Sequence, residues 1–158
     1  AGHAKAAFNL GLCCSQGLGL PPSWGQAFHW FKKAAGLGHP RAALRVAHCY
    51  RQGVPVDQSI LEAARWYRSA SELGLGTAVE AEAQFQLGLL YLDPAVSLEG
   101  AGPNLEEGRR LLEAAAALGH AAARDRAAKL PPRGGRGDPA RPALELESDA
   151  AAVEGGAG

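Results

Sequence analysis

Five histidines and three cysteines are the residues of this chain whose chemistry could support a metal site or nucleophilic catalysis. His3, His39 and His120 each follow a glycine and fall at equivalent junctions of a repeat, which places them too far apart to share one metal ion. Cys13 and Cys49 are also equivalent positions and fit small buried residues. The spacings typical of zinc sites, Cys-x-x-Cys and His-Glu-x-x-His, are missing from the sequence. We therefore predict no metal site, no cofactor and no catalytic residue.

Three weaker motifs point to other chemistry. A pair formed by Cys14 and His48 across neighbouring helices is the remaining catalytic alternative, and no other residue of the sequence supports it. The glycine-rich stretch 133–137 has neither the preceding strand nor the following Lys-Ser/Thr of a phosphate-binding loop. Arg136-Gly137-Asp138 matches the integrin-binding tripeptide, but binding would require an extracellular address, so an accidental match is the better interpretation.

Composition excludes further classes. The 158 residues include 16 Lys and Arg against 16 Asp and Glu, so the broad electrostatic argument for a nucleic-acid or membrane-surface partner is lacking. No run of apolar residues is long enough to span a bilayer, so we predict no membrane insertion. The odd number of cysteines, two of them adjacent, favours a reducing compartment such as the cytoplasm.

Any functional residues are positioned by an internal repeat. Residues 6–11 align with residues 42–47 at an offset of 36, and at the same offset Trp30-Phe31 falls on Trp66-Tyr67. A third copy resumes at residues 83–91, after five extra residues around Thr77 to Ala81 that precede its first helix. The copies predict a helical repeat protein, in which stacked neighbours cover one another's apolar faces.

Within each unit the pattern predicts two helices. The first unit has Ala7, Leu10, Gly11 and Cys14 at helical spacing over residues 4–16, which predicts that they lie on one face of a helix. The Gly11 position is where the second helix must pass closely. Ser23 is the predicted N-cap of that second helix, and in the second unit Asp57 or Ser59 takes this place. The pairs Trp30-Phe31 and Trp66-Tyr67 are predicted to lie in the core.

These motifs resemble a known family. Leu10-Gly11, Ala27-x-x-Trp30-Phe31 and Ala34-Ala35-x-x-Gly38 in the first unit, with Ala63-x-x-Trp66-Tyr67 and Leu87-Gly88-x-x-Tyr91 in the later units, match the pattern of the Sel1-like repeat family. This family consists of tetratricopeptide-related helical hairpins. The resemblance implies an all-α fold, a right-handed α/α superhelix (solenoid) of about three and a half helical-hairpin repeats with a concave surface that binds partners.

The predicted repeat domain covers residues 1–130. Its units span about 3–38, 39–74 and 75–119, and a degenerate half-unit spans 120–130. Residues 131–158 change in composition to proline, glycine and acidic residues, which predicts a disordered tail.

The first helix of each hairpin lines the concave groove in solenoids of the tetratricopeptide type, and the positions not used for packing become candidate binding residues. Arg41, Arg45 and Arg51 on the middle first helix favour an acidic segment or a chain-terminal carboxylate. The predicted groove residues are Lys5, Phe8, Asn9, Leu12, Arg41, Leu44, Arg45, His48, Arg51, Phe85, Gln86 and Leu89.

The function predicted from the sequence is a non-catalytic scaffold or adaptor that binds a peptide or a partner helix in this groove. The alternative is a self-associating assembly module that stacks through its repeat ends, on copies of itself or on missing repeats, as part of a longer repeat protein. Residues 1–3 look like the end of a preceding repeat, which suggests that one hairpin face is open.

Overall fold

The computed structural model describes residues 2–19, 21–96, 98 and 103–132. Seven α-helices follow one another in this part of the chain: α1 (Gly2–Gln16), α2 (Trp24–Gly36), α3 (Pro40–Gln52), α4 (Ile60–Leu73), α5 (Ala78–Leu92), α6 (Leu105–Ala117) and α7 (Ala121–Ala128). They belong to one compact unit, Ala1–Ala128. Most of the predicted tail, and with it the Arg-Gly-Asp tripeptide, lies outside the described residues.

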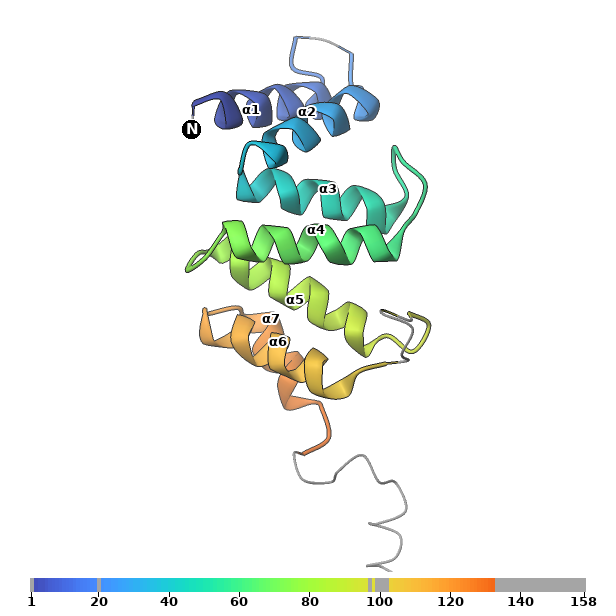
Figure 1. The fold of residues 1–158 in the computed structure, drawn as a ribbon, viewed down its shortest axis with the longest axis vertical. Helices are drawn as coiled ribbons and strands as arrows, with labels where there is room; N and C mark the ends of the chain where they lie inside the picture. The colour runs from blue at the N-terminus through green and yellow to red at the C-terminus, as the bar shows by residue number, and fades with distance from the viewer. Residues whose placement is uncertain (1, 20, 97, 99–102, 133–158) are drawn as a thin grey trace, which may run out of the picture. The chain divides into compact units, whose positions relative to one another are not determined.

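The helices pair in the order of the sequence. Hairpins form between α1 and α2, between α3 and α4, and between α5 and α6, and successive hairpins contact each other through α2 with α3 and α4 with α5 (Figure 1). The last helix, α7, packs on α6. This arrangement confirms the predicted all-α repeat solenoid.

Side chains cap the second helices as the sequence predicts. Ser23 Oγ accepts a hydrogen bond from the Gln26 amide at 3.3 Å, at the start of α2. In the next hairpin, Ser59 Oγ accepts from the Glu62 amide at 3.2 Å. Of the two alternatives for the second unit, Asp57 and Ser59, the structure therefore selects Ser59. These caps satisfy amides that have no partner within the helix.

The junction histidines have a capping role too. His39 Nδ1 accepts from the Ala42 amide at 3.3 Å before α3, and His120 Nδ1 accepts from the Ala123 amide at 3.1 Å before α7. His3, by contrast, lies exposed in the first turns of α1. The equivalence predicted from the repeat thus holds structurally for two of the three histidines.

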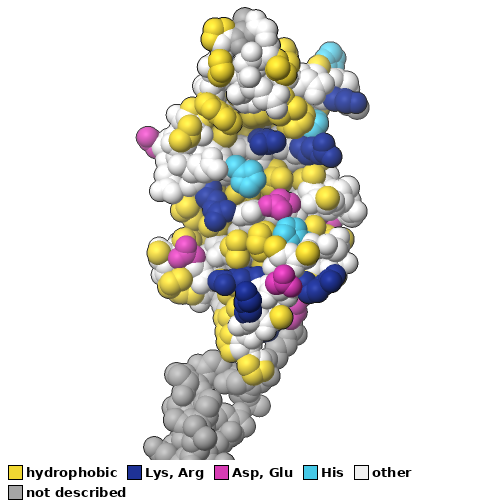
Figure 2. All heavy atoms as spheres, turned by 180° about the vertical axis from the view of Figure 1, so that it is seen from behind, with side chains coloured by type: hydrophobic (Ala, Val, Ile, Leu, Met, Phe, Trp, Pro, Cys, Tyr) yellow, Lys and Arg dark blue, Asp and Glu magenta, His cyan; other side chains and the backbone are white. Residues whose placement is uncertain are grey.

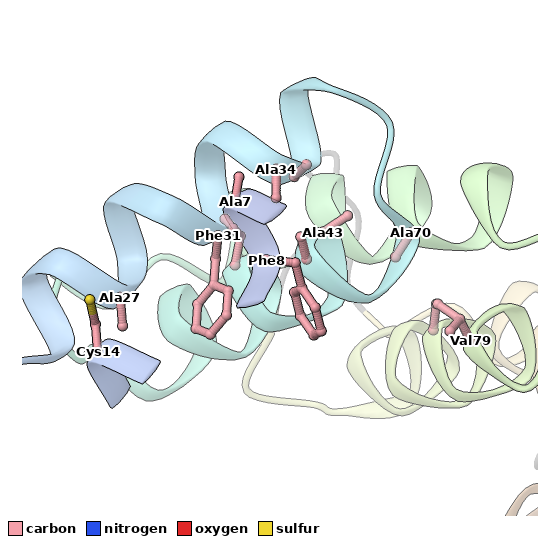
Figure 3. Packing of buried hydrophobic residues seen from close by; sticks show 13 residues of the cluster. Ala7, Phe8, Cys14, Ala27, Phe31, Ala34, Ala43, Ala70 and Val79 are labelled. Carbon is pink, nitrogen blue, oxygen red and sulfur yellow. The ribbon is translucent and has the colours of Figure 1, made fainter. Parts of the chain in front are cut away.

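The cores of the first two hairpins consist of aromatic rings among alanines, and in the third hairpin Leu112 takes the place of the ring. Phe31 and Tyr67 are among the most completely buried large side chains, and Figure 3 shows Phe31 beside Phe8 among the alanines. A Cβ added to Gly11 would lie 2.6 Å from carbon atoms of the Phe31 ring, so α1 and α2 can approach this closely only because residue 11 has no side chain. The predicted close approach at Gly11 is confirmed.

Two predictions about the core need correction. Cys13 is half-buried although its equivalent Cys49 is buried, and Leu10 on the same face of α1 is 45% exposed, because none of the described helices covers that face. Trp30 and Trp66 are only partly buried at the margin of the core, whereas Phe31 and Tyr67, their neighbours in the motif, occupy its centre.

No helix in the described ranges combines the length and the apolar composition that crossing a membrane requires.

Candidate functional site

Two adjoining hollows lie on the surface that the first helices of the hairpins form together. One of about 430 Å³ is lined by α1, the start of α3 and the start of α5. The other, of about 500 Å³, continues along the same three helices. They share Phe8, Arg41 and Val79, and together we call them the groove. Figure 2 shows a face on which basic, histidine and acidic side chains lie beside hydrophobic ones.

The structure brings most of the predicted groove residues together. The residues that line the groove and were predicted from the sequence are Lys5, Phe8, Asn9, Leu12, Arg41, Leu44, Arg45 and His48. Arg51 and Leu89 line a separate hollow of about 510 Å³, which also includes Arg126. Phe85 and Gln86 are used in contacts between helices instead.

Phe8 lines the groove and also belongs to the hydrophobic core. Its side chain is 8% exposed, and its ring stacks on the His39 ring with centroids 4.3 Å apart. A second ring, that of Phe31, lies 5.7 Å away. The junction histidine thus covers most of the Phe8 ring, although the residue still lines both hollows of the groove. Phe85 repeats the arrangement, stacking on His120 at 4.4 Å.

Part of the groove wall comes from residues that the repeat pattern did not single out. Ala81 is the equivalent of Pro40, the first residue of α3, but α5 begins earlier, at Ala78, with Thr77 as its N-cap. The insertion therefore forms an extra turn of helix, and Ala78 and Val79 on this turn line the groove. The five extra residues were visible in the sequence, but their helical form and orientation were not.

Glu82 is the acidic residue of the groove, and its charge is compensated within the protein. Gln86 Nε2 donates to Glu82 Oε1 at 2.7 Å, and Gln86 Oε1 in turn accepts from Arg51. His120 Nε2 lies 2.8 Å from Glu82 Oε2. Because His120 Nδ1 accepts from the Ala123 amide, the neutral ring has its proton on Nε2 and donates to Glu82.

The same contacts set the ionisation of Glu82. Burial raises the pKa of this carboxyl, but the hydrogen bonds from Gln86 and His120 and the nearby imidazoles outweigh it, so the pKa lies below the usual range for glutamate. Glu82 is therefore ionised and occupied by its own neighbours at neutral pH.

The basic side chains of the groove have no such compensation. Lys5, Arg41 and Arg45 are exposed, and no ion pair involves them in the part of the chain that the structure describes. Arg41 and Arg45 are separated by one helical turn on α3, so their guanidinium groups lie on the same side of that helix. The groove therefore offers positive charge to an incoming group.

His48 lies beside this charge as a neutral hydrogen-bonding group. Its Nδ1 is 2.8 Å from the hydroxyl oxygen of Tyr67. Burial lowers the pKa of His48, and Arg45 and Arg51 lower it further against the opposing effect of Glu82. Burial also raises the pKa of Tyr67 to about 12, so its phenol stays protonated.

Neither a catalytic Cys14–His48 pair nor a cluster of metal ligands is found among the described residues. Cys14 Sγ lies 3.9 Å from Gln26 Oε1, while His48 is paired with Tyr67, so Cys14 and His48 do not form a pair. Among the residues described, no three His, Cys, Asp or Glu side chains gather in a way that could hold a metal ion.

Comparison with known families finds the Sel1 repeat three times in this chain, at residues 4–39, 40–75 and 81–120. Residues 76–80, between the second and third matches, include part of the extra turn of α5. A search of curated proteins found no significant match.

Two solved structures show the same architecture. A Sel1 repeat protein from Oxalobacter formigenes is 27% identical, covers 82% of this chain and 90% of its own, and superposes with a TM-score of 0.68. The cysteine-rich protein B of Helicobacter pylori is 20% identical, with a TM-score of 0.57 over 77% of this chain and 86% of its own. The second similarity supports the fold alone.

Proposed function

The chain belongs to the Sel1 repeat family, whose members are generally non-catalytic scaffolds for protein interactions, and on this premise we propose that it binds an extended acidic segment of a partner protein in the groove. The observation that supports this ligand most strongly is the set of uncompensated basic side chains, Lys5, Arg41 and Arg45, beside a glutamate that is already paired.

The charges favour a carboxylate over other groups. Arginine guanidinium groups bind carboxylates through two parallel hydrogen bonds, and two arginines one turn apart can contact successive acidic side chains of an extended segment. A basic segment would meet Arg41 and Arg45 as like charges and would find Glu82 already occupied by His120 and Gln86.

The shape and the apolar lining fit an extended peptide. The two hollows adjoin along α1, α3 and α5, and half-buried Leu12 and Leu44 lie in the floor between the basic side chains. An extended segment alternates its side chains, so acidic residues can face the arginines while an apolar neighbour contacts the leucines.

Selection from a random peptide library with the full 158-residue chain tests this proposal. We expect the selected peptides to contain Asp or Glu next to apolar residues. The double variant Arg41→Glu/Arg45→Glu should bind the synthesised peptides at least about tenfold more weakly, because two charge-assisted contacts become repulsive.

The matched control is Lys32→Glu/Lys33→Glu on α2, which changes the net charge by the same amount at residues that do not line the groove. This control should bind the peptides as the wild type does, and circular dichroism should show that both variants are folded. Equal weakening by both double variants, or selected peptides without acidic residues, would contradict the proposal.

A further inference from the structure

The separate hollow of about 510 Å³ lies further along α3 than the groove does. Arg51 on α3 lines it, and His48, the last residue that α3 contributes to the groove, comes one helical turn earlier. Residues of α5, of the loop that follows α5 and of α7 also line this hollow, and Arg126 is the residue from α7. We call it the Arg51–Arg126 hollow.

Both arginines of this hollow keep their charge available for a ligand. Arg51 donates to Gln86 Oε1 and also hydrogen-bonds Tyr67, so neutral partners hold its guanidinium group in place without cancelling its charge. Arg126 is exposed, and none of the ion pairs among the described residues involves it. An anion that enters the hollow can therefore contact two guanidinium groups from different helices.

Asp93 is the acidic residue of the hollow. It is exposed, and its Oδ1 accepts a hydrogen bond from the Ala95 amide at 2.9 Å, within the loop after α5. With two arginines and one aspartate, the lining carries one net positive charge. This charge matches a single carboxylate rather than a cluster of acidic side chains.

Apolar side chains also line the hollow. Leu89 and Leu92 of α5, Ile60 at the start of α4 and Val96 in the loop after α5 are all half-buried. A ligand that fills the hollow therefore has to bring a carboxylate and an apolar group into the same small space.

The last residue of a polypeptide carries both groups. Neighbouring side chains of an extended segment point to opposite sides, so an internal Asp or Glu and the apolar residue next to it do not enter one hollow together. A C-terminal residue, by contrast, has its main-chain carboxylate beside its own side chain.

We propose that the Arg51–Arg126 hollow binds the C-terminal residue of the acidic partner segment. The carboxylate lies between Arg51 and Arg126, and the apolar side chain contacts Leu89 and Leu92. This inference rests on the proposed function, because it places the end of the segment that the groove binds.

The distance along α3 fits a short peptide. Arg41 and Arg51 are ten residues apart on this helix, which corresponds to about 15 Å. An extended segment covers about 3.3 Å per residue, so four to five residues span this distance. Acidic residues can therefore face Arg41 and Arg45 while the end of the same segment lies in the Arg51–Arg126 hollow.

Two random libraries of peptides of about seven residues, offered to the full 158-residue chain, test this inference. All peptides of one library end in a free carboxylate, and all peptides of the other end in a carboxamide. We expect the free-carboxylate library to enrich Leu, Ile or Val at the last position and Asp or Glu before it. Amidation of a selected peptide should weaken its binding about tenfold, because the charge-assisted hydrogen bonds to the arginines are lost.

The variant Arg126→Ala should weaken binding of the free-carboxylate peptide about tenfold and leave binding of its amidated form unchanged. Arg124→Ala is the matched control, because Arg124 is exposed on the same helix but does not line the hollow. This control should bind both forms as the wild type does, and circular dichroism should show that both variants are folded. The comparison of the two peptide forms on the wild type needs no variant.

Equal affinity of the wild type for the free and the amidated peptide would overturn the inference, and so would an equal loss for both forms in Arg126→Ala. The proposed function fails separately, if Arg41→Glu/Arg45→Glu binds the amidated peptides as tightly as the wild type does. If neither library yields a binder, both proposals are wrong.

Discussion

At Gly11 the packing of the first hairpin depends on a missing side chain. Replacing it with alanine would bring a Cβ to 2.6 Å from the Phe31 ring, which is buried and has little freedom to move. We expect Gly11→Ala to lower the free energy of unfolding by about 1–3 kcal/mol in urea titrations, through overpacking. Gly25→Ala on α2, where a Cβ meets no atom within 4 Å, is the control and should not destabilise the protein.

His48 makes stability depend on pH. Its pKa in the folded state is lowered from 6.5, chiefly by burial, so below about pH 6.5 the unfolded chain binds the proton more readily. The free energy of unfolding should therefore fall as the pH drops from about 7 to about 5. His48→Gln should lose less stability over that range, as measured by urea unfolding at each pH. Part of the decrease should remain, because the pKa of His39 is lowered too. An unchanged decrease would contradict this assignment.

Single residues also show where prediction from the sequence reached its limit. Gly11 and Ser23 were predictable because their roles depend on neighbours a few residues away or in the same hairpin. The partners of Glu82 were not, since His120 belongs to another unit and lies 38 residues further along the chain. Helical periodicity likewise indicated an apolar face for α1 but not whether a neighbour covers Leu10.

At the scale of the helices, His39 at the start of α3 stabilises the protein through two contacts. It caps the Ala42 amide and stacks on Phe8 of the preceding hairpin. We expect His39→Ala to lower the free energy of unfolding by about 1–2 kcal/mol, since both contacts are lost. His39→Asn should recover about 1 kcal/mol, because asparagine caps well but cannot stack.

Urea unfolding of the wild type, His39→Asn and His39→Ala measures whether their free energies of unfolding decrease in this order. If alanine and asparagine destabilise equally, the cap contributes nothing and only the stacking matters. Since His120 repeats both contacts with Phe85 and α7, the same order is expected there.

The elements differ in how far the sequence determined them. Each helix pair followed from the spacing of glycine, alanine and aromatic residues, and the repeat confirmed it three times. The extra turn of α5 had no equivalent copy to compare with, so its length and direction followed only from the structure. Thr77 and Val79 illustrate this, because their capping and packing depend on the turn at Gly74, where a Cβ would lie 3.0 Å from Val79.

In the described repeat unit, each helix contacts chiefly the helices next to it in the sequence, with a smaller contact between α3 and α5 of adjacent hairpins. Stability in such a protein is close to a sum of hairpin and interface contributions. The central helices have neighbours on both sides, whereas α1 packs on α2 and leaves Leu10 exposed. Local opening should therefore cost less at α1 than at the central helices α3 and α4.

Native-state hydrogen exchange tests this gradient. We expect the amides of α1 to exchange through local opening at a lower free energy than those of α3 and α4, which open only with the interfaces on both sides. Equal protection in α1 and α3 would show instead that the repeat unit opens as one cooperative block.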